Sequence, residues 1–342
     1  MPTVTEPILV WGGGAIGGTL AAYWARAGID VLLVDLERDH VTACRTRGME
    51  ISGPLDEFVI RIPAITPDEV EGRFDRVVLA VKAQHTRTAI ETIRPHLSAE
   101  GFVVSAQNGL NELSISEVVG KSATVGAFVN FGADWHGPGQ VLFGNRGAVV
   151  VGEIDGTILS RTKEMHKLLQ IFEPDAVLTD NIWGYLWGKL AYGAMLFATA
   201  LNNDSMADNF ADRHRTKLWI AIGREVMGLA TKKGIQPLGF NGFDPMAYLP
   251  GATDLQAEAS VKEMAEFNRM SAKTHSGIWR DLAVRKRKTE VTEQLGILVK
   301  LANEDDFDVP LIRLIIDLIH EVENGLREMS SETFAVLLDR CE

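Results

Sequence analysis

A short apolar segment that runs directly into a cluster of glycines constrains the fold of this chain more than any other feature. Ile8 to Trp11 predicts a buried parallel strand, and Gly12 to Gly18 follows it at once. A helix is predicted from Gly18 to Ala27 and a second strand from Asp30 to Val34. Strand, glycine turn, helix and strand in this order are typical of a Rossmann-type doubly wound sheet.

The glycines follow the pattern G-x-G-x-x-G, which gives each of them a task. Gly12 would make the tight turn, Gly14 would let the backbone approach a pyrophosphate, and Gly17 would let the helix pack closely on the strand. Together with Ala15 and Ile16, they would direct a helix N-terminus at the phosphates. We therefore predict dinucleotide binding here. A plain strand-to-helix turn is the alternative.

Asp35 ends the second strand, 18 residues after Gly17, near the spacing at which a carboxylate binds the adenosine ribose hydroxyls. Its charge would repel a 2′-phosphate, so it favours NAD over NADP. Arg38 lies one helical turn later and could accept that phosphate, which leaves NADP open. The alternative role for Asp35 is a helix N-cap.

Three further strands are predicted, from Arg76 to Val81, Phe102 to Ser105 and Thr124 to Val129. Ligands of an open parallel sheet bind beyond the carboxyl ends of its strands. Lys82 and Asn108 follow the first two strands and are therefore candidate site residues. A surface lysine and a simple Asn-Gly turn are the alternatives.

The glycine-rich and then β-branched sequence from Gly132 to Glu153 predicts hairpin strands that extend the sheet edge, with His136 exposed in the turn region. A helix from Ile158 to Phe172 and a last strand from Ala176 to Leu178 follow. The domain boundary is predicted near Asp180.

The fold class is therefore an α/β nucleotide-binding domain, 1–180, followed by an all-α domain, 181–342. Almost every periodic segment of the second half is helical. The predicted helices are Ile182 to Leu201, Arg213 to Lys233, Leu255 to Ala272, Thr289 to Asn303, Pro310 to Asn324 and Ser331 to Arg340.

The first of these helices is almost wholly apolar except for Lys189 near its centre. A membrane span is the alternative, but the lysine would then lie near the bilayer midplane, and charged sequence follows from Asp204. In a buried helix, an ammonium needs partners or a wet cleft, and desolvation lowers its pKa towards the range useful for proton transfer. A snorkelling or salt-bridged lysine is the structural alternative.

The composition excludes several classes of partner. A net charge of -12 argues against nucleic acid and anionic membrane, and the basic run from Arg285 to Lys288 is predicted to be a solvated helix face. Cys44 and Cys341 form no disulfide framework and show no metal-ligand spacing, so no metal is expected. The N-terminus lacks the basic region of a signal peptide, and we expect a cytoplasmic protein.

The chain resembles the ketopantoate reductases (2-dehydropantoate 2-reductases) over nearly its whole length. The resemblance rests on five motifs taken together. They are GGGAIG at Gly12 to Gly17, VKAQHT at Val81 to Thr86, QNGL at Gln107 to Leu110, WGKL at Trp187 to Leu190 and TEVTEQLG at Thr289 to Gly296.

The resemblance implies reduction of a 2-oxo acid with a nicotinamide cofactor, usually NADPH. It implies Lys189 as the general acid that protonates the carbonyl oxygen, and Glu290 as the residue that holds the substrate hydroxyl. Asn108 and Lys82 would line the cofactor and substrate crevice. For Glu290, a first-turn helix acid is the alternative.

The sequence departs from the family pattern at the substrate pocket. Gly193 and Phe197 stand where the family has asparagines, which removes two polar contacts. Gly277 stands at a family serine, which leaves His275 and Ser276 as candidate substitutes in substrate binding. The spacing from Asp281 to Glu290 is also one residue longer than expected.

These observations predict an NAD(P)H-dependent reductase that converts a small-molecule 2-oxo acid to a 2-hydroxy acid, with 2-dehydropantoate as the default substrate. The alternatives are a family member that acts on another oxo acid or carbonyl compound, and a dinucleotide-binding sensor without turnover. The sequence leaves open whether the chain forms a homodimer.

Overall fold

The computed structural model describes residues 6–240, 242–270 and 273–341. The chain folds into two compact units, Met1–Ile182 and Trp183–Glu342. Ala272, the predicted end of one helix, lies outside the described residues.

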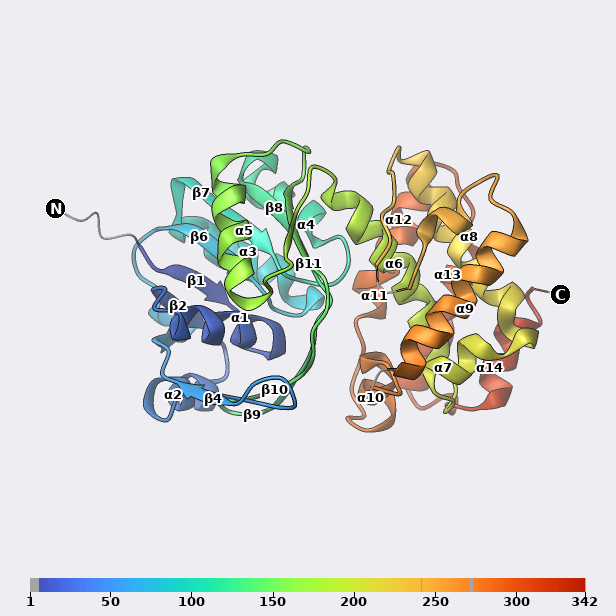
Figure 1. Cartoon of the computed structure of the whole chain (residues 1–342), viewed down its shortest axis with the longest axis horizontal. Helices are drawn as coiled ribbons and strands as arrows, with labels where there is room; N and C mark the ends of the chain where they lie inside the picture. The colour runs from blue at the N-terminus through green and yellow to red at the C-terminus, as the bar shows by residue number, and fades with distance from the viewer. Residues whose placement is uncertain (1–5, 241, 271–272, 342) are drawn as a thin grey trace. The chain divides into compact units, whose positions relative to one another are not determined.

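The first unit is built on an eight-stranded sheet in the order β12-β11-β8-β7-β6-β1-β2-β5 (Figure 1). From β8 to β5 all neighbours are parallel, whereas β11 is antiparallel to β8. The predicted Rossmann-type sheet is confirmed. The strands are β1 Ile8–Trp11, β2 Val31–Val34, β5 Ala64–Ile65, β6 Phe74–Leu79, β7 Leu97–Ser105, β8 Thr124–Val129, β11 Val149–Glu153 and β12 Val177–Leu178.

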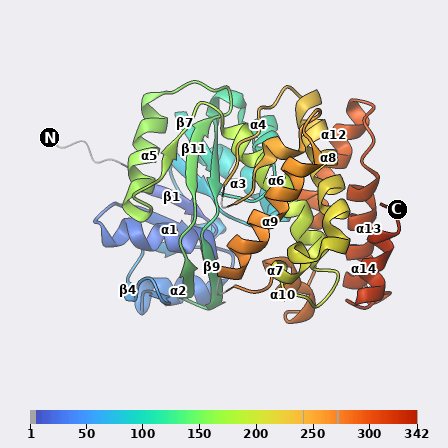
Figure 2. The ribbon, with the colours of Figure 1, turned by 45° about the vertical axis from the view of Figure 1, so that its right-hand side comes forward.

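Helices cover both faces of this sheet because alternate strand residues point to opposite sides. Ile8 and Val10 of β1 pack in a core with side chains of α1 and α5, two helices that lie side by side (Figures 1 and 2). Leu9 and Trp11 enter a second core with side chains of α3 and α4. The helices are α1 Ala15–Arg26, α2 Arg38–Thr46, α3 Thr86–Ile93, α4 Asn111–Val119 and α5 Ser160–Phe172.

A separate four-stranded sheet has the order β4-β3-β10-β9, with β3 Met49–Ser52, β4 Phe58–Ile60, β9 Gly132–Gly137 and β10 Gln140–Asn145. The prediction that the whole segment from Gly132 to Glu153 extends the main sheet was therefore wrong. Val141 of β10 pairs with Ile51 of β3, and only β11 joins the main sheet. His136 is exposed, as predicted, but it lies on β9 and not in the turn.

The second unit is built from helices. Their bounds are α6 Ile182–Thr199, α7 Met206–Ala211, α8 Thr216–Lys232, α9 Asp254–Met270, α10 Gly277–Ala283, α11 Val291–Gln294, α12 Gly296–Glu304, α13 Pro310–Glu323 and α14 Ser331–Leu338. The helix predicted from Thr289 to Asn303 is divided at Leu295 into α11 and α12, where Gly296, a poor helix former, begins the second piece.

At Gly188 of helix α6, another segment approaches the helix backbone closely. Gly184 O accepts a hydrogen bond from Leu238 N at 2.9 Å, and a Cβ on Gly188 would lie 2.3 Å from Leu238 O. This contact offsets the low helix propensity of glycine. In the described part of the chain no helix is long and apolar enough to cross a membrane.

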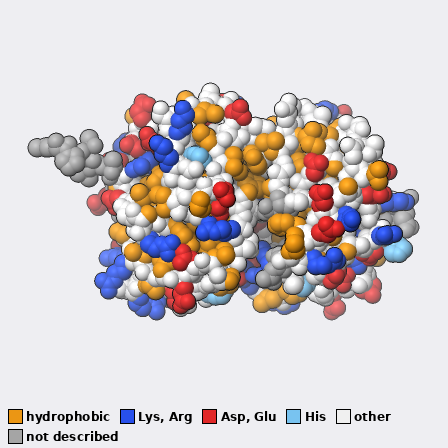
Figure 3. Space-filling view, viewed as in Figure 1, with side chains coloured by type: hydrophobic (Ala, Val, Ile, Leu, Met, Phe, Trp, Pro, Cys, Tyr) orange, Lys and Arg blue, Asp and Glu red, His pale blue; other side chains and the backbone are white. Residues whose placement is uncertain are grey.

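The basic run from Arg285 to Lys288 is exposed, as predicted, but the prediction that it lies on a helix was wrong. Helix α10 ends at Ala283, Lys286 has a positive φ of 50°, and Arg285 and Arg287 both pair with Asp281 at 2.9 Å. On the face seen in Figure 3, Lys and Arg side chains alternate with Asp and Glu and form no continuous basic surface.

Candidate functional site

Close packing requires glycine at two positions of the turn between β1 and α1. Gly12 has a φ of +102°, and a Cβ there would lie 2.8 Å from the carbonyl carbon of Ala80. A Cβ on Gly17 would lie 2.0 Å from Gly12 O, far inside van der Waals contact. The turn and the helix–strand approach predicted for these two glycines are therefore both present.

Gly14, unlike Gly12 and Gly17, is not closely packed, because a Cβ there would meet nothing within 4 Å. It is the N-cap of α1, and no side chain caps this helix end. The N–H groups at Ala15 and Ile16 begin the helix, where the dipole favours an anion. Open space beside an uncapped helix N-terminus fits the pyrophosphate of a dinucleotide.

The Asp35 carboxylate holds the glycine turn. Its Oδ2 accepts a hydrogen bond from Gly13 N at 2.7 Å, and its Oδ1 accepts one from Glu37 N at 2.9 Å. Each carboxylate oxygen can accept a second bond, so both remain available to ribose hydroxyls. Arg38 pairs with Asp68 at 3.4 Å, but both side chains are exposed, so this pair is weak.

His40, which sequence analysis did not select, is buried behind the glycine turn. A Cβ on Gly13 would lie 2.7 Å from its Nε2, and its Nδ1 accepts a hydrogen bond from Gly139 N at 2.9 Å. Burial lowers the pKa of His40, so the ring is neutral at pH 7. His40 thus links the glycine turn to the β9–β10 hairpin, a role that only the fold reveals.

The loops that carry Lys82 and Asn108 are joined by the buried side chain of Gln107. Its Nε2 donates to Val81 O and to Thr86 Oγ1, each at 2.8 Å. Asn108 is exposed and Lys82 is partly exposed. These two predicted residues therefore follow β7 and β6 at the same edge of the sheet, beside β1 and its glycine turn.

Glu112 of α4 is fully buried, and its two carboxylate oxygens meet no well-aligned hydrogen-bond partner in the described part of the chain. Burial raises the pKa of this carboxyl to about 8, and its own backbone N–H and the nearby Ser105 hydroxyl offset part of the rise. The folded chain therefore keeps the proton of Glu112 at pH 7, whereas the unfolded chain loses it near pH 4.3. The side chain thus destabilises the fold increasingly between these two pH values.

We predict that Glu112→Gln raises the melting temperature by about 5 °C at pH 8, because the amide needs no proton to remain neutral. The gain should shrink towards pH 5, where Glu112 is protonated to a larger extent in the unfolded chain. Scanning calorimetry at the two pH values checks this. Glu117→Gln is the matched control, since Glu117 lies on the same helix with its side chain 58% exposed. An equal gain at both pH values would refute the assignment.

In the second unit, Lys189 of α6 is desolvated and interacts electrostatically with two charged side chains. Desolvation lowers the pKa of Lys189 to about 7, the positive charge of Lys273 contributes to the lowering, and the Glu290 carboxylate partly offsets both. An amine with a pKa near 7 can donate or accept a proton at neutral pH. The two residues predicted to be catalytic, Lys189 and Glu290, therefore interact with each other, and Lys273 also acts on the amine.

Glu290 is the N-cap of α11, but its side chain does not cap the helix. The preceding residue is fixed instead: Thr289 N and Oγ1 both donate to Glu323 Oε1 at 2.7 Å. The backbone of Glu290 is thereby held, and the carboxylate interacts with Lys189.

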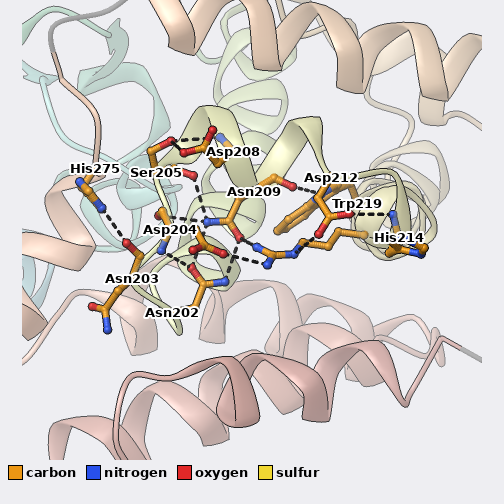
Figure 4. Close-up of polar contacts among 11 residues, drawn as sticks. Asn202, Asn203, Asp204, Ser205, Asp208, Asn209, Asp212, His214, Trp219 and His275 are labelled. Atoms are coloured by element: carbon orange, nitrogen blue, oxygen red, sulfur yellow. Dashed lines mark hydrogen bonds and ion pairs between the residues drawn. The ribbon is translucent and has the colours of Figure 1, made fainter.

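His275 and Ser276 make local contacts. His275 Nε2 lies 3.2 Å from Asn203 O (Figure 4). Its Nδ1 lies 2.9 Å from Thr274 Oγ1. Ser276 is buried and caps α10, with its Oγ accepting a hydrogen bond from Trp279 N at 3.1 Å. His275 therefore joins the segment before α10 to the turn after α6, and Ser276 fixes the start of α10.

Gly193 and Phe197, which stand where the family has asparagines, differ in their surroundings. Phe197 is fully buried in the core of the second unit. Gly193 lies one turn after Lys189 and is partly exposed, and the nearest atom to a Cβ there would be Gln294 Oε1 at 4.0 Å. Gly193 therefore leaves open space on the turn next to the lysine. No group of three or more metal-ligating side chains occurs among the described residues.

Comparison with known proteins places both units in one family. Residues 8–156 match the family model described as ketopantoate reductase PanE/ApbA, and residues 181–323 match its C-terminal counterpart. A 2-dehydropantoate 2-reductase of Archaeoglobus fulgidus is 26% identical over 94% of this chain and 99% of the relative.

Solved structures share the fold. A D-mandelate dehydrogenase in a ternary structure with NADH and anilino(oxo)acetate has a TM-score of 0.81 at 20% identity, covering 94% of this chain and 99% of that one. A PanE/ApbA family ketopantoate reductase of Ralstonia eutropha has a TM-score of 0.78 at 21% identity, with the same coverage. With two family matches that together span most of its length, the chain belongs to the ketopantoate reductase family and is an oxidoreductase that acts on a CH–OH group with a nicotinamide dinucleotide cofactor.

Proposed function

We propose that this protein reduces a 2-oxo acid to the 2-hydroxy acid, with 2-dehydropantoate as the default substrate. Residues 1–180 would bind the cofactor and residues 181–342 would supply the catalytic groups. The observation that carries the proposal is the desolvated ammonium of Lys189, whose pKa is lowered to about 7, with the Glu290 carboxylate beside it.

The reaction requires a proton donor for the carbonyl oxygen and a group that orients the substrate. When bound, the reduced nicotinamide supplies a hydride to the carbonyl carbon. The carbonyl oxygen then gains negative charge, which the Lys189 ammonium stabilises before donating its proton to form the hydroxyl group. Glu290 would accept a hydrogen bond from a substrate hydroxyl and so orient the substrate. Lys189 recovers its proton from solvent after each turnover.

A second substrate class is favoured by one observation, the open space at Gly193. An asparagine at this position would fill that space and offer polar contacts, whereas glycine leaves room for a larger, less polar substituent. The D-mandelate dehydrogenase with a similar fold was solved with anilino(oxo)acetate, an oxo acid with an aromatic substituent. We therefore propose aromatic or branched 2-oxo acids as the alternative substrates.

A panel of 2-oxo acids tests the function. 2-Dehydropantoate, phenylglyoxylate, 2-oxoisovalerate and pyruvate are assayed with NADH and with NADPH by loss of dihydronicotinamide absorbance. Highest kcat/KM for 2-dehydropantoate supports the default, and highest kcat/KM for phenylglyoxylate supports the alternative. Binding of the cofactor without reduction of any member would overturn the proposal in favour of a non-catalytic sensor.

For the cofactor, we propose NAD, because the Asp35 carboxylate is held by Gly13 N and would repel a 2′-phosphate. Asp35→Asn should raise the ratio of kcat/KM for NADPH to that for NADH roughly tenfold, since it removes one negative charge while keeping an acceptor for Gly13 N. Asp39→Asn, on the exposed surface of α2, is the control for net charge. An unchanged ratio in the Asp35 variant would remove the basis for this preference.

A further inference from the structure

The side-chain amide of Gln294 borders the open space beside Gly193. Helices α6 and α11, which carry these two residues, lie next to each other in the second unit (Figure 1). For a Cβ placed on Gly193, the nearest atom from another segment of the described chain would be Gln294 Oε1, at 4.0 Å. Both residues are partly exposed, whereas Ala194 and Leu295, which follow them, are buried. The space between the two positions is therefore open and not packed shut.

Backbone and core contacts fix the face of α11 on which Gln294 lies. Gln294 N donates to Glu290 O at 2.9 Å, so these two residues lie one helical turn apart on the same face. Val291 and Leu295 are also one turn apart, joined by a hydrogen bond of 2.8 Å from Leu295 N to Val291 O, and both are buried. Because this second face is anchored in the core, Gln294 is held on the face that carries Glu290.

The same spacing relates Lys189 and Gly193 on α6. The charge of Glu290 acts on Lys189, and Gln294 lies beside Gly193 one turn further along both helices. One helical turn advances about 5.4 Å. A 2-oxo acid whose carbonyl oxygen contacts Lys189 can therefore reach Gln294 with a group on the second carbon beyond the carbonyl.

The substituent of the 2-oxo acid suits this place better than the carboxylate does. Glu290 carries a negative charge on the same face of α11, so it would repel the substrate carboxylate. The Gln294 amide is neutral and offers two N–H donors and one carbonyl acceptor. Its side chain makes no hydrogen bond within the described part of the chain, so these groups are available to a ligand.

We propose that Gln294 is a specificity-determining residue that forms a hydrogen bond with a hydroxyl group on the substituent of the 2-oxo acid. A hydroxyl group both donates and accepts, so it can donate to the Glu290 carboxylate and accept from the Gln294 amide. The inference rests on the proposed function and deepens it. It selects 2-oxo acids with a hydroxyl-bearing substituent, such as 2-dehydropantoate, over aromatic ones.

The test compares two substrates in Gln294→Met, which keeps the length of the side chain but removes the amide. The substrates are 2-dehydropantoate and trimethylpyruvate, which has a hydrogen atom in place of the hydroxyl group. The variant should lower kcat/KM for 2-dehydropantoate about 5- to 20-fold, mainly through KM, and leave kcat/KM for trimethylpyruvate within about twofold. Gln170→Met, the control, makes the same change at an exposed position of α5 and should alter neither value.

Gly193→Asn gives an independent readout, because it brings an amide into the same space from α6. In Gln294→Met, it should raise the ratio of kcat/KM for 2-dehydropantoate to that for trimethylpyruvate at least about threefold. In the parent, where Gln294 already serves the hydroxyl group, this ratio should change less. An equal change in the two backgrounds would show that the positions act separately and would overturn the proposal.

The outcomes separate this inference from the proposed function. If the parent reduces neither of these substrates nor phenylglyoxylate, the proposed function fails. If the parent reduces 2-dehydropantoate and trimethylpyruvate equally well, or if Gln294→Met lowers kcat/KM equally for both, the assignment of Gln294 fails while the function stands. Reduction of phenylglyoxylate but not of 2-dehydropantoate would also overturn this assignment.

Discussion

Replacing Lys189 with methionine should lower kcat for 2-oxo acid reduction by about 10²- to 10⁴-fold and leave cofactor affinity within about twofold. Methionine fills a similar apolar volume on α6 but cannot donate a proton to the carbonyl oxygen or stabilise its charge. Because desolvation already destabilises the ammonium, whose pKa is lowered to about 7, the variant should be at least as stable as the parent. Steady-state kinetics measures the fall in kcat, and fluorescence titration with NADH measures the cofactor affinity.

Two controls sharpen this result. Lys217→Met removes an exposed lysine from α8 and should leave kcat unchanged. Lys189→Arg retains a positive charge but not a group that can release a proton near neutral pH, so it should recover little activity. Parental kcat in Lys189→Met would show that another group protonates the substrate.

The second large effect is expected at the glycine turn. Gly17→Ala places a Cβ 2.0 Å from Gly12 O and 2.9 Å from the Cβ of Ala80, so helix α1 must move away from the sheet. We expect a loss of about 3 kcal/mol or more in unfolding free energy, seen as a melting temperature lower by about 6–12 °C or as insoluble protein.

Gly14→Ala is the matched comparison on the same turn. Its Cβ meets no protein atom within 4 Å, and the backbone at φ -67° and ψ -158° suits any residue. The melting temperature should therefore stay within about 1 °C of the parent, while NADH affinity falls at least about tenfold because the methyl group occupies the space of the pyrophosphate. Parental NADH affinity in Gly14→Ala would contradict the assignment of this turn to the cofactor.

The sheet of the first unit was predictable because its signals are local. Ile8 to Trp11 is a continuous apolar run and Thr124 to Val129 is a mostly apolar one, and their bounds agree with β1 and β8. The glycine pattern marks the turn that follows β1. Most helix ends differ from the prediction by a few residues, as expected where capping rather than periodicity sets the end.

The second sheet was not predictable in the same way. Glu50 of β3 pairs with Gln140 of β10, so its pairing joins residues 90 apart in the sequence. The hairpin was expected, but nothing in its own sequence tells which edge it joins. The break between α11 and α12 was missed because the apolar periodicity continues through Leu295.

In the candidate site, too, some residues could be predicted from local sequence signals and others could not. Sequence motifs alone predicted a role in proton transfer for Lys189, and roles in dinucleotide binding for Asp35 and Gly14. His40 and Lys273 have no such signal: the first matters because the fold places it behind Gly13, and the second because it lies near an amine 84 residues earlier in the chain. Only three-dimensional proximity reveals charges of this kind.

The pH dependence of reduction, measured between about pH 5.5 and about pH 9 with saturating reduced cofactor, tests the central claim most directly. Lys189 must be protonated to act, so kcat/KM should be high at acidic pH and fall as the pH rises through about 7. The fall in kcat should come at higher pH, because the bound carboxylate favours the ammonium. A profile of kcat/KM that stays flat across this range, or the same fall in Lys189→Met, would contradict Lys189 as the general acid.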